Sequence, residues 1–307
     1  MKRSTILFLA AFIAMPSFTT AGELPYNNKQ DLLAKTSERM VVAQSTVTEY
    51  DGSGVLQLGS SKALIINQAT GETLYAKNTD TPTPIASVTK LMTAMVVLDA
   101  DLPMDELISI GREDIDTLKN TTSRLRVGTK LPRGEMLRLA LMSSENRAAS
   151  SLARHYPGGL SAFVKDMNKK AYELGMTKTR FVEPTGLNSG NVSTAEDLVK
   201  LVRAAYEYEQ IRQESTATSQ EITINGGRNK MQFINTNSLV RKGDWVIGLS
   251  KTGYISESGR CLVMQAEIGG QPLIIVLLDS SGKMTRIGDA NRIRKWIEQS
   301  YITARMG

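Results

Sequence analysis

Residues 261–278 read CLVMQAEIGGQPLIIVLL, two largely apolar runs separated by a pair of glycines. Short runs rich in Val, Ile and Leu between turn residues are typical of β-strands. Gly269 and Gly270 indicate a tight hairpin, because glycine adopts positive φ values at no steric cost. The pattern therefore predicts two antiparallel strands, over 261–268 and 273–278.

Outward from this hairpin, strand patterns recur on both sides of a helical region. Further strands are predicted near the two ends, over 63–66, 73–76, 221–224, 230–234 and 246–254. Apolar residues spaced three and four apart predict helices over about 87–98, 133–142, 146–156, 160–174 and 194–208, with a last helix around Trp296. This order predicts an α+β fold, in which an antiparallel sheet shared by the terminal strands is flanked by a helical block.

The composition is that of an ordinary globular protein, with 307 residues, 41% hydrophobic content and a formal net charge of +6. The basic residues are dispersed and form no long run, so no nucleic-acid partner is expected. Cys261 is the only cysteine, which excludes an internal disulfide. Its apolar neighbours predict a buried thiol.

The N-terminus has the pattern of a cleaved signal peptide over 1–21. A positive start, an apolar run, a helix breaker and small residues follow in order, at Lys2-Arg3, 6–15, Pro16 and 19–21. The apolar run is much shorter than the roughly 20 residues that a transmembrane helix needs, so no transmembrane anchor is expected. An uncleaved anchor remains the alternative. After the signal we expect a polar arm over 22–55 and one main domain over 56–307.

Several kinds of chemistry are excluded by what the chain lacks. A zinc site draws three or four ligands mostly from His and Cys, but His155 is the only histidine, so neither a metal nor a cofactor is expected. No Gly-x-Ser-x-Gly string or glycine-rich phosphate loop is present. His155 ends a predicted helix, where it favours a capping role over a catalytic one.

The string Ser87-Val88-Thr89-Lys90 is the first candidate for catalysis. Residues three apart on a helix lie on one face, with Cβ atoms about 5–6 Å apart, so the Ser87 hydroxyl and the Lys90 amine can meet. A lysine in partly apolar surroundings has a lowered pKa and can act as a base. Taken alone, the same string also fits a helix cap followed by a surface amine.

Two later strings add to this pair. Ser144-Glu145-Asn146 interrupts two predicted helices, which places Ser144 and Asn146 on a loop. Lys251-Thr252-Gly253 ends a predicted strand, where the glycine is expected to let a ligand backbone approach the strand edge.

In this order, the three strings resemble those of the serine β-lactamase and penicillin-binding protein superfamily. The stretches PIASVTKLMT at 84–93 and FVEPTGL at 181–187 resemble one branch of it more closely. That branch is the D-alanyl-D-alanine endopeptidases, low-molecular-mass penicillin-binding proteins of the 7/8 type in the peptidase S11 family. The resemblance spans about 58–300 and implies a DD-peptidase/β-lactamase-like transpeptidase fold.

The resemblance implies a role for each matching residue. Ser87 is the nucleophile that forms an acyl-enzyme, Lys90 takes its proton, and Ser144 relays a proton to the leaving amine. The remaining positions are implied to bind substrate. Asn146 contacts the substrate amide, Lys251 with Thr252 binds the carboxylate, and Gly253 forms the strand edge. The backbone N–H of Tyr254 pairs with that of Ser87 to bind the oxyanion.

The implied function of the catalytic domain, 56–307, is DD-endopeptidase cleavage of D-alanyl-diaminopimelate cross-links in the periplasm. The implied partners are peptidoglycan peptide stems and, as covalent inhibitors, β-lactams. DD-carboxypeptidase activity, a β-lactamase and a non-catalytic penicillin sensor remain alternatives. Against the β-lactamase, the stretch 181–188 has no Glu-x-x-x-Asn string where class A β-lactamases carry one, and Pro184 beside Glu183 indicates a rigid loop. Slow release of a β-lactam adduct is expected.

Overall fold

The computed structural model describes residues 56–224 and 229–306. The predicted signal peptide over 1–21 and the predicted arm over 22–55 lie outside the described residues. In the described part, no helix is both long enough and apolar enough to cross a membrane.

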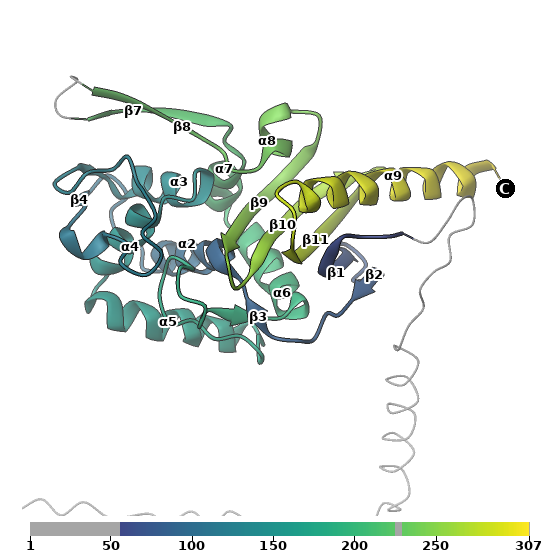
Figure 1. Ribbon diagram of the computed structural model, residues 1–307, viewed down its shortest axis with the longest axis horizontal. Helices are drawn as coiled ribbons and strands as arrows, with labels where there is room; N and C mark the ends of the chain where they lie inside the picture. The colour runs from purple at the N-terminus through teal and green to yellow at the C-terminus, as the bar shows by residue number, and fades with distance from the viewer. Residues whose placement is uncertain (1–55, 225–228, 307) are drawn as a thin grey trace, which may run out of the picture. The chain divides into compact units, whose positions relative to one another are not determined.

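A five-stranded antiparallel sheet forms the centre of the fold, in the order β2-β1-β11-β10-β9 (Figure 1). Its strands are β1 (Ser60–Asn67), β2 (Thr73–Lys77), β9 (Val246–Ile255), β10 (Gly259–Ile268) and β11 (Gln271–Ser280). Each contains a strand predicted from the sequence. The expected hairpin is present: Gly269 and Gly270 have φ values of +60° and +76°, and Ile268 pairs with Gln271 across the turn.

The strands from the two ends of the chain do share this sheet. β1 pairs with β11 along its length, and Ile65 lies opposite Ile275. The predicted strands over 221–224 and 230–234 do not join it. They form a separate two-stranded ribbon, β7 (Ser219–Ile224) with β8 (Asn229–Ile234), which extends from the helical side of the molecule (Figure 1).

The helical block lies between β2 and β9 in the sequence. The five helices predicted in this part of the chain are all present. Its members are α2 (Thr89–Asp99), α3 (Arg133–Met142), α4 (Asn146–Arg154), α5 (Gly159–Glu173), α6 (Ala195–Tyr206) and α7 (Glu209–Thr216). Two further helices, α8 (Ser238–Lys242) and α9 (Thr285–Met306), follow it. α7 and α8 were not predicted. Short paired strands connect the block: β3 (Thr83–Pro84) with β6 (Val192–Ser193), and β4 (Leu107–Ser109) with β5 (Lys130–Pro132).

The sheet separates two hydrophobic cores. Along β11, Val276 and Leu278 pack in the core shared with the helical block, whereas Ile275 and Leu277 pack in a second core. This alternation follows from the two-residue period of a strand. On the other side of the second core lie four residues of α9, namely Ile287, Ala290, Ile293 and Ile297. The layers are therefore helical block, sheet and α9 (Figure 1).

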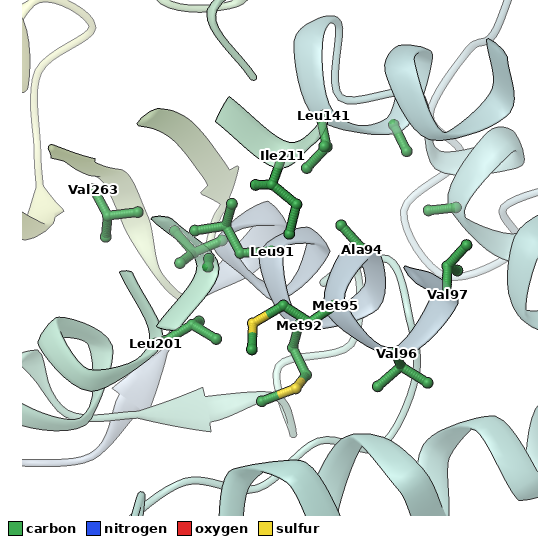
Figure 2. Packing of buried hydrophobic residues seen from close by; sticks show 14 of the residues in the cluster. Leu91, Met92, Ala94, Met95, Val96, Val97, Leu141, Leu201, Ile211 and Val263 are labelled. Atoms are coloured by element: carbon green, nitrogen blue, oxygen red, sulfur yellow. The ribbon is translucent and has the colours of Figure 1, made fainter. Parts of the chain in front are cut away.

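Helix α2 is buried on every side, and nine consecutive residues from Thr89 to Val97 are buried. Figure 2 shows Leu91 and Met95 of α2 in the core, with Leu141, Ile211 and Val263 from α3, α7 and β10 around them. A helix that is apolar on all faces belongs in the middle of a protein. Side chains at the N-terminal end of α2 are therefore held on a rigid support.

Candidate active site

Ser87 lies just before α2, in the 3₁₀ turn η1 (Ala86–Val88). The sequence predicted a helix starting at Ser87, but the α-helix starts two residues later, at Thr89. Ala86 has a φ of +46°, in the left-handed region that residues other than glycine rarely occupy. Backbone strain of this kind is typical of functional sites, and here it adjoins the candidate nucleophile.

The Lys90 side chain occupies the centre of the site and is only 1% exposed. Its Nζ donates to Ser87 Oγ at 2.8 Å, Asn146 Oδ1 at 2.8 Å and the Thr185 carbonyl oxygen at 2.6 Å. Burial lowers the pKa of Lys90 to about 7, although the negative charges of Glu183 and Glu145 act in the opposite direction. The amine therefore exchanges between charged and neutral forms near neutral pH, and the neutral form has a lone pair that can accept the Ser87 proton.

A second buried amine serves a second hydroxyl. Ser144, in the turn between α3 and α4, has a φ of +60°. Lys251 Nζ donates to Ser144 Oγ at 2.9 Å and to the Thr252 carbonyl oxygen at 3.0 Å. Burial lowers the pKa of Lys251 well below its usual value, and the positive charges of Lys90 and Arg286 lower it further.

Asn146 begins α4 and connects the two sides of the site. Its Oδ1 accepts from Lys90, and its Nδ2 donates to Thr121 Oγ1 at 3.1 Å. The loop that carries Thr121 is tied to the β9–β10 turn by an ion pair between Lys119 and Glu257. None of the three motifs contains this loop, so it was not predicted as part of the site.

Strand β9 supplies the third motif. Thr252 Oγ1 donates to Thr236 Oγ1 at 2.6 Å. Gly253 faces the nucleophile turn: a Cβ atom there would lie 3.0 Å from the Ile85 carbonyl oxygen and 3.1 Å from Ser87 N. We expected this glycine to admit a ligand backbone. In the structure, the backbone that approaches it is that of the turn before α2.

Tyr254 follows on the same strand, and its side chain is 55% exposed. The Arg260 guanidinium lies 4.3 Å from the centre of its ring.

The structure places all eight predicted site residues on η1, α2, the α3–α4 turn, the start of α4 and β9. The contacts of Lys90 with Asn146 and of Lys251 with Ser144 link the three motifs into one site.

Three residues of the site were assigned no role from the sequence. The Thr185 carbonyl contacts Lys90, and Gly186 packs on the nucleophile turn, where a Cβ would lie 1.9 Å from the Ala86 oxygen. Arg286, on α9, has buried Nε and Nη1 atoms without a hydrogen-bond partner among residues 56–224 and 229–306. Thr185 and Gly186 lie in the stretch 181–187 that carries the family resemblance, but the roles of a backbone carbonyl and of a missing Cβ cannot be read from residue types, and Arg286 lies in none of the quoted stretches.

The excluded candidates lie where structural roles predict. His155 is the C-terminal cap of α4, with its Nδ1 2.9 Å from the Ser151 carbonyl oxygen. Cys261 is fully buried on β10, and burial raises the pKa of its thiol. Within the described ranges, no three His, Cys, Asp or Glu side chains lie close enough to hold a metal ion.

The chain was compared with known proteins. The family model of peptidase S11, D-alanyl-D-alanine carboxypeptidase, matches residues 45–282. Curated relatives include D-alanyl-D-alanine endopeptidases from Pseudomonas aeruginosa, 49% identical over 81% of this chain and 80% of the relative, and from Escherichia coli K12, 48% identical over 80% and 79%. The chain belongs to the peptidase S11 family.

Solved structures agree with this assignment. The Streptomyces K15 DD-transpeptidase superposes with a TM-score of 0.72 at 30% identity, over 78% of this chain and 97% of that one. The fold is therefore the α+β fold of the DD-transpeptidases. A Bacillus subtilis D-alanyl-D-alanine carboxypeptidase is also similar, at 30% identity over 86% of this chain and 69% of the relative.

Proposed function

We propose that this protein is a serine DD-peptidase of peptidoglycan, working through an acyl-enzyme on Ser87. The observation that carries the proposal is the fully buried Lys90 amine, 2.8 Å from Ser87 Oγ, with a pKa of about 7. A nucleophile activated by an adjacent base of this kind performs acyl transfer. No histidine is needed for it.

In the proposed acylation, neutral Lys90 takes the Ser87 proton while Oγ bonds to the D-alanyl carbonyl carbon. The negative charge that develops on the carbonyl oxygen is assigned to the backbone N–H groups of Ser87 and Tyr254, which the packing of Gly253 on the nucleophile turn brings together. Removing a donor from such a pair costs roughly 3–4 kcal/mol in related chemistry.

The carbon–nitrogen bond then breaks, and the leaving amine needs a proton. Ser144 is the proposed relay, since its hydroxyl already accepts from Lys251. Water subsequently attacks the acyl carbon and gives up one proton, which restores the one that the Ser144 relay donated to the amine. The ester bond to Ser87 Oγ then breaks, the product acid leaves, and the proton held by Lys90 returns to Ser87.

Recognition of the substrate carboxylate is proposed for Lys251, Thr252 and Arg286. Lys251 and Arg286 repel each other, and both are partly or wholly desolvated. An anion beside them would relieve that repulsion and accept from the buried Arg286 nitrogens that have no partner among the described residues. Asn146 is proposed to hold the substrate amide through its Nδ2 group.

Within this chemistry, we favour endopeptidase cleavage of D-alanyl-diaminopimelate cross-links. The relatives at 48–49% identity bear the name endopeptidase, whereas the Bacillus subtilis carboxypeptidase is 30% identical. The family description supports carboxypeptidase activity as the second candidate. Incubation with purified cross-linked muropeptide dimers separates the two. We expect monomers, and release of free D-alanine alone would establish the carboxypeptidase.

The nucleophile is tested by covalent labelling with a fluorescent penicillin. We expect a stable adduct on the wild-type protein and none on Ser87→Ala, because only the Ser87 hydroxyl contacts the buried Lys90 amine. Ser161→Ala is a suitable matched control, since it also removes one serine hydroxyl, at an exposed position on α5. Undiminished labelling of Ser87→Ala would refute the assignment.

Export to the periplasm through the signal peptide over 1–21 is part of the same proposal. Peptidoglycan stems and β-lactams, the proposed partners, are both met outside the inner membrane. N-terminal sequencing of the protein purified from the periplasmic fraction would identify the mature end, which we expect after Ala21.

A further inference from the structure

The carboxylate of Glu183 lies at the centre of the loop over 182–191, which follows Phe181. Its Oε2 accepts from the Thr185 backbone N–H at 2.6 Å and from the Thr185 hydroxyl. Its Oε1 accepts from Gly186 N at 2.6 Å and from Asn191 Nδ2 at 2.9 Å. One side chain therefore folds this loop around itself.

Two contacts fasten the loop to α2. The fully buried Asn191 side chain donates to Glu183 and also to Thr89 Oγ1 at 3.0 Å. Thr93 Oγ1 donates to the Pro184 carbonyl oxygen at 2.6 Å. The loop is thus attached to the same helix that carries Lys90.

The residues that Glu183 holds are the ones that contact the reactive pair. The Thr185 carbonyl accepts from Lys90, and the Gly186 backbone lies so close to the nucleophile turn that a Cβ would be 2.7 Å from Ser87 N. A displacement of the loop would therefore move an acceptor of the base and a support of the nucleophile together.

The geometry also indicates what Glu183 does not do. A carboxylate offers about four lone-pair sites, and five protein donors point at them here, the fifth being the Asn188 N–H at 3.4 Å from Oε1. No acceptor position remains to activate a hydrolytic water. This distinguishes the residue from a glutamate that acts as a general base.

We propose that Glu183 is a positioning residue, whose carboxylate shapes the loop so that Thr185 and Gly186 hold Lys90 and Ser87 in the geometry for attack. The inference rests on the proposed function, because it concerns the same reaction.

A purely electrostatic role is the main competitor. The charged groups that face Lys90 are Glu183 and Glu145, which raise its pKa, and Lys251, which repels it. Glu145 provides a matched control, because its carboxylate accepts from Ser123 and not from the loop. Glu145→Gln removes a comparable charge without altering the contacts of Thr185 or Gly186.

The experiment measures the rate of acylation by a fluorescent penicillin from pH 5 to pH 9, and the rate at which the adduct hydrolyses. In Glu183→Gln an amide nitrogen replaces one oxygen and faces at least one N–H donor at either position, so we expect the plateau rate to fall about 10–100-fold, as for a misplacement on the scale of 1 Å. Glu183→Asp, which keeps both acceptors, should recover part of that loss.

Glu145→Gln is expected to shift the acid limb of the profile to lower pH with its plateau within a few-fold of wild type. If Glu183→Gln merely reproduces that shift, the positioning role is wrong and charge is sufficient. If Glu183→Gln acylates normally but its adduct hydrolyses more slowly, Glu183 is a general base and the proposal fails.

Two further measurements keep these outcomes separate from other failures. If circular dichroism shows that Glu183→Gln is unfolded, Thr185→Val removes one donor to the carboxylate and is expected to slow acylation less, in the same direction. An unchanged rate in that folded variant would overturn the proposal. The proposed function is refuted separately from the role of Glu183, by a wild-type protein that forms no adduct on Ser87 and cleaves no muropeptide.

Discussion

At the scale of single residues, the site depends on two lysines that the fold has desolvated. Lys90 and Lys251 are each 1% exposed, and their positive charges repel each other. Each amine contacts one serine hydroxyl, Ser87 or Ser144. An ordinary lysine is almost fully protonated at neutral pH, so burial is what makes Lys90 available as a base.

The pKa of Lys90 predicts the pH dependence of the first chemical step. Because its pKa is about 7, the neutral fraction of Lys90 grows as the pH rises from 6 to 8. The rate of acylation by penicillin should therefore increase through an acid limb with a midpoint near 7, measured by stopped-flow or timed labelling. A rate that is flat over this range would contradict the assignment of the base.

The same residue links pH to stability. The pKa of Lys90 is 10.5 when unperturbed and about 7 in the folded protein, so the unfolded chain binds more protons between these values. Its contribution to the free energy of unfolding is complete above pH 10.5 and is lost as the pH falls to about 7. Lys90→Met should flatten this dependence in urea titrations and abolish acylation, whereas an unchanged slope would indicate an exposed amine.

At the scale of elements, the position of the nucleophile turn is set by what packs against it. The loop at Gly186 and strand β9 at Gly253 both pack against it. A Cβ at Gly186 would collide with the Ala86 oxygen at 1.9 Å, and a Cβ at Gly253 would make a tight contact of 3.0 Å with the Ile85 oxygen. Ala86, which has a left-handed φ, lies against both glycines. Tertiary packing therefore holds a turn that the local sequence would not adopt unaided.

Gly186→Ala tests this packing. Its φ of +82° penalises any side chain, and the new Cβ would in addition meet the Ala86 backbone at 1.9 Å. Gly71→Ala is the matched control, because Gly71 has a φ of +78° but no atom within 4 Å of the added Cβ.

Both substitutions should lose about 1–2 kcal/mol for the left-handed conformation. Gly186→Ala should lose a further 1–3 kcal/mol, roughly the cost of overpacking, together with most of its acylation rate. Urea unfolding and penicillin labelling measure the two effects. Equal losses of stability in both variants would show that the close contact is unimportant.

The elements with strong periodicity were predictable from the sequence, and the rest depended on tertiary contacts. Apolar spacing predicted the helices over 133–142 and 160–174 nearly to their ends. It could not predict α7, because Ile211 is the only large apolar side chain in that helix. It also placed the start of α2 at Ser87, since nothing local signals that the backbone at Gly186 and Gly253 packs against a 3₁₀ turn there.

The site divides in the same way. Ser87, Lys90, Ser144 and Lys251 lie in short strings whose residue types and order carry chemical meaning, so the sequence predicts them as candidates, and hydrogen bonds join them in two pairs. Arg286 was not, because it is brought to Lys251 only when the last helix packs on the sheet.

At the scale of the whole molecule, the sheet divides stability between two cores of which one carries the site. The core with α9 contains no member of the three motifs. The first turn of α9 carries Arg286, so damage to that core two or more turns away from Arg286 should reduce stability without altering the contact between Ser87 and Lys90 in the molecules that remain folded.

Ile293→Ala tests this separation. Ile293 is fully buried in the α9 core, so truncation should cost about 2–5 kcal/mol of unfolding free energy. Lys295→Ala, at an exposed position on the same helix, should change it by less than about 0.5 kcal/mol. At low temperature both variants should be acylated at the wild-type rate. A large fall in the acylation rate of folded Ile293→Ala would show that the two cores are coupled.

The pairing of β1 with β11 constrains how the chain is made. β1 begins at Ser60, and its partner strand is not complete until Ser280 has been synthesised. Contacts between such distant segments form slowly, because a long loop must close before they yield any free energy. A chain emerging from the ribosome therefore cannot complete its sheet until nearly all of it is present, and a nascent chain halted before β11 should remain sensitive to protease.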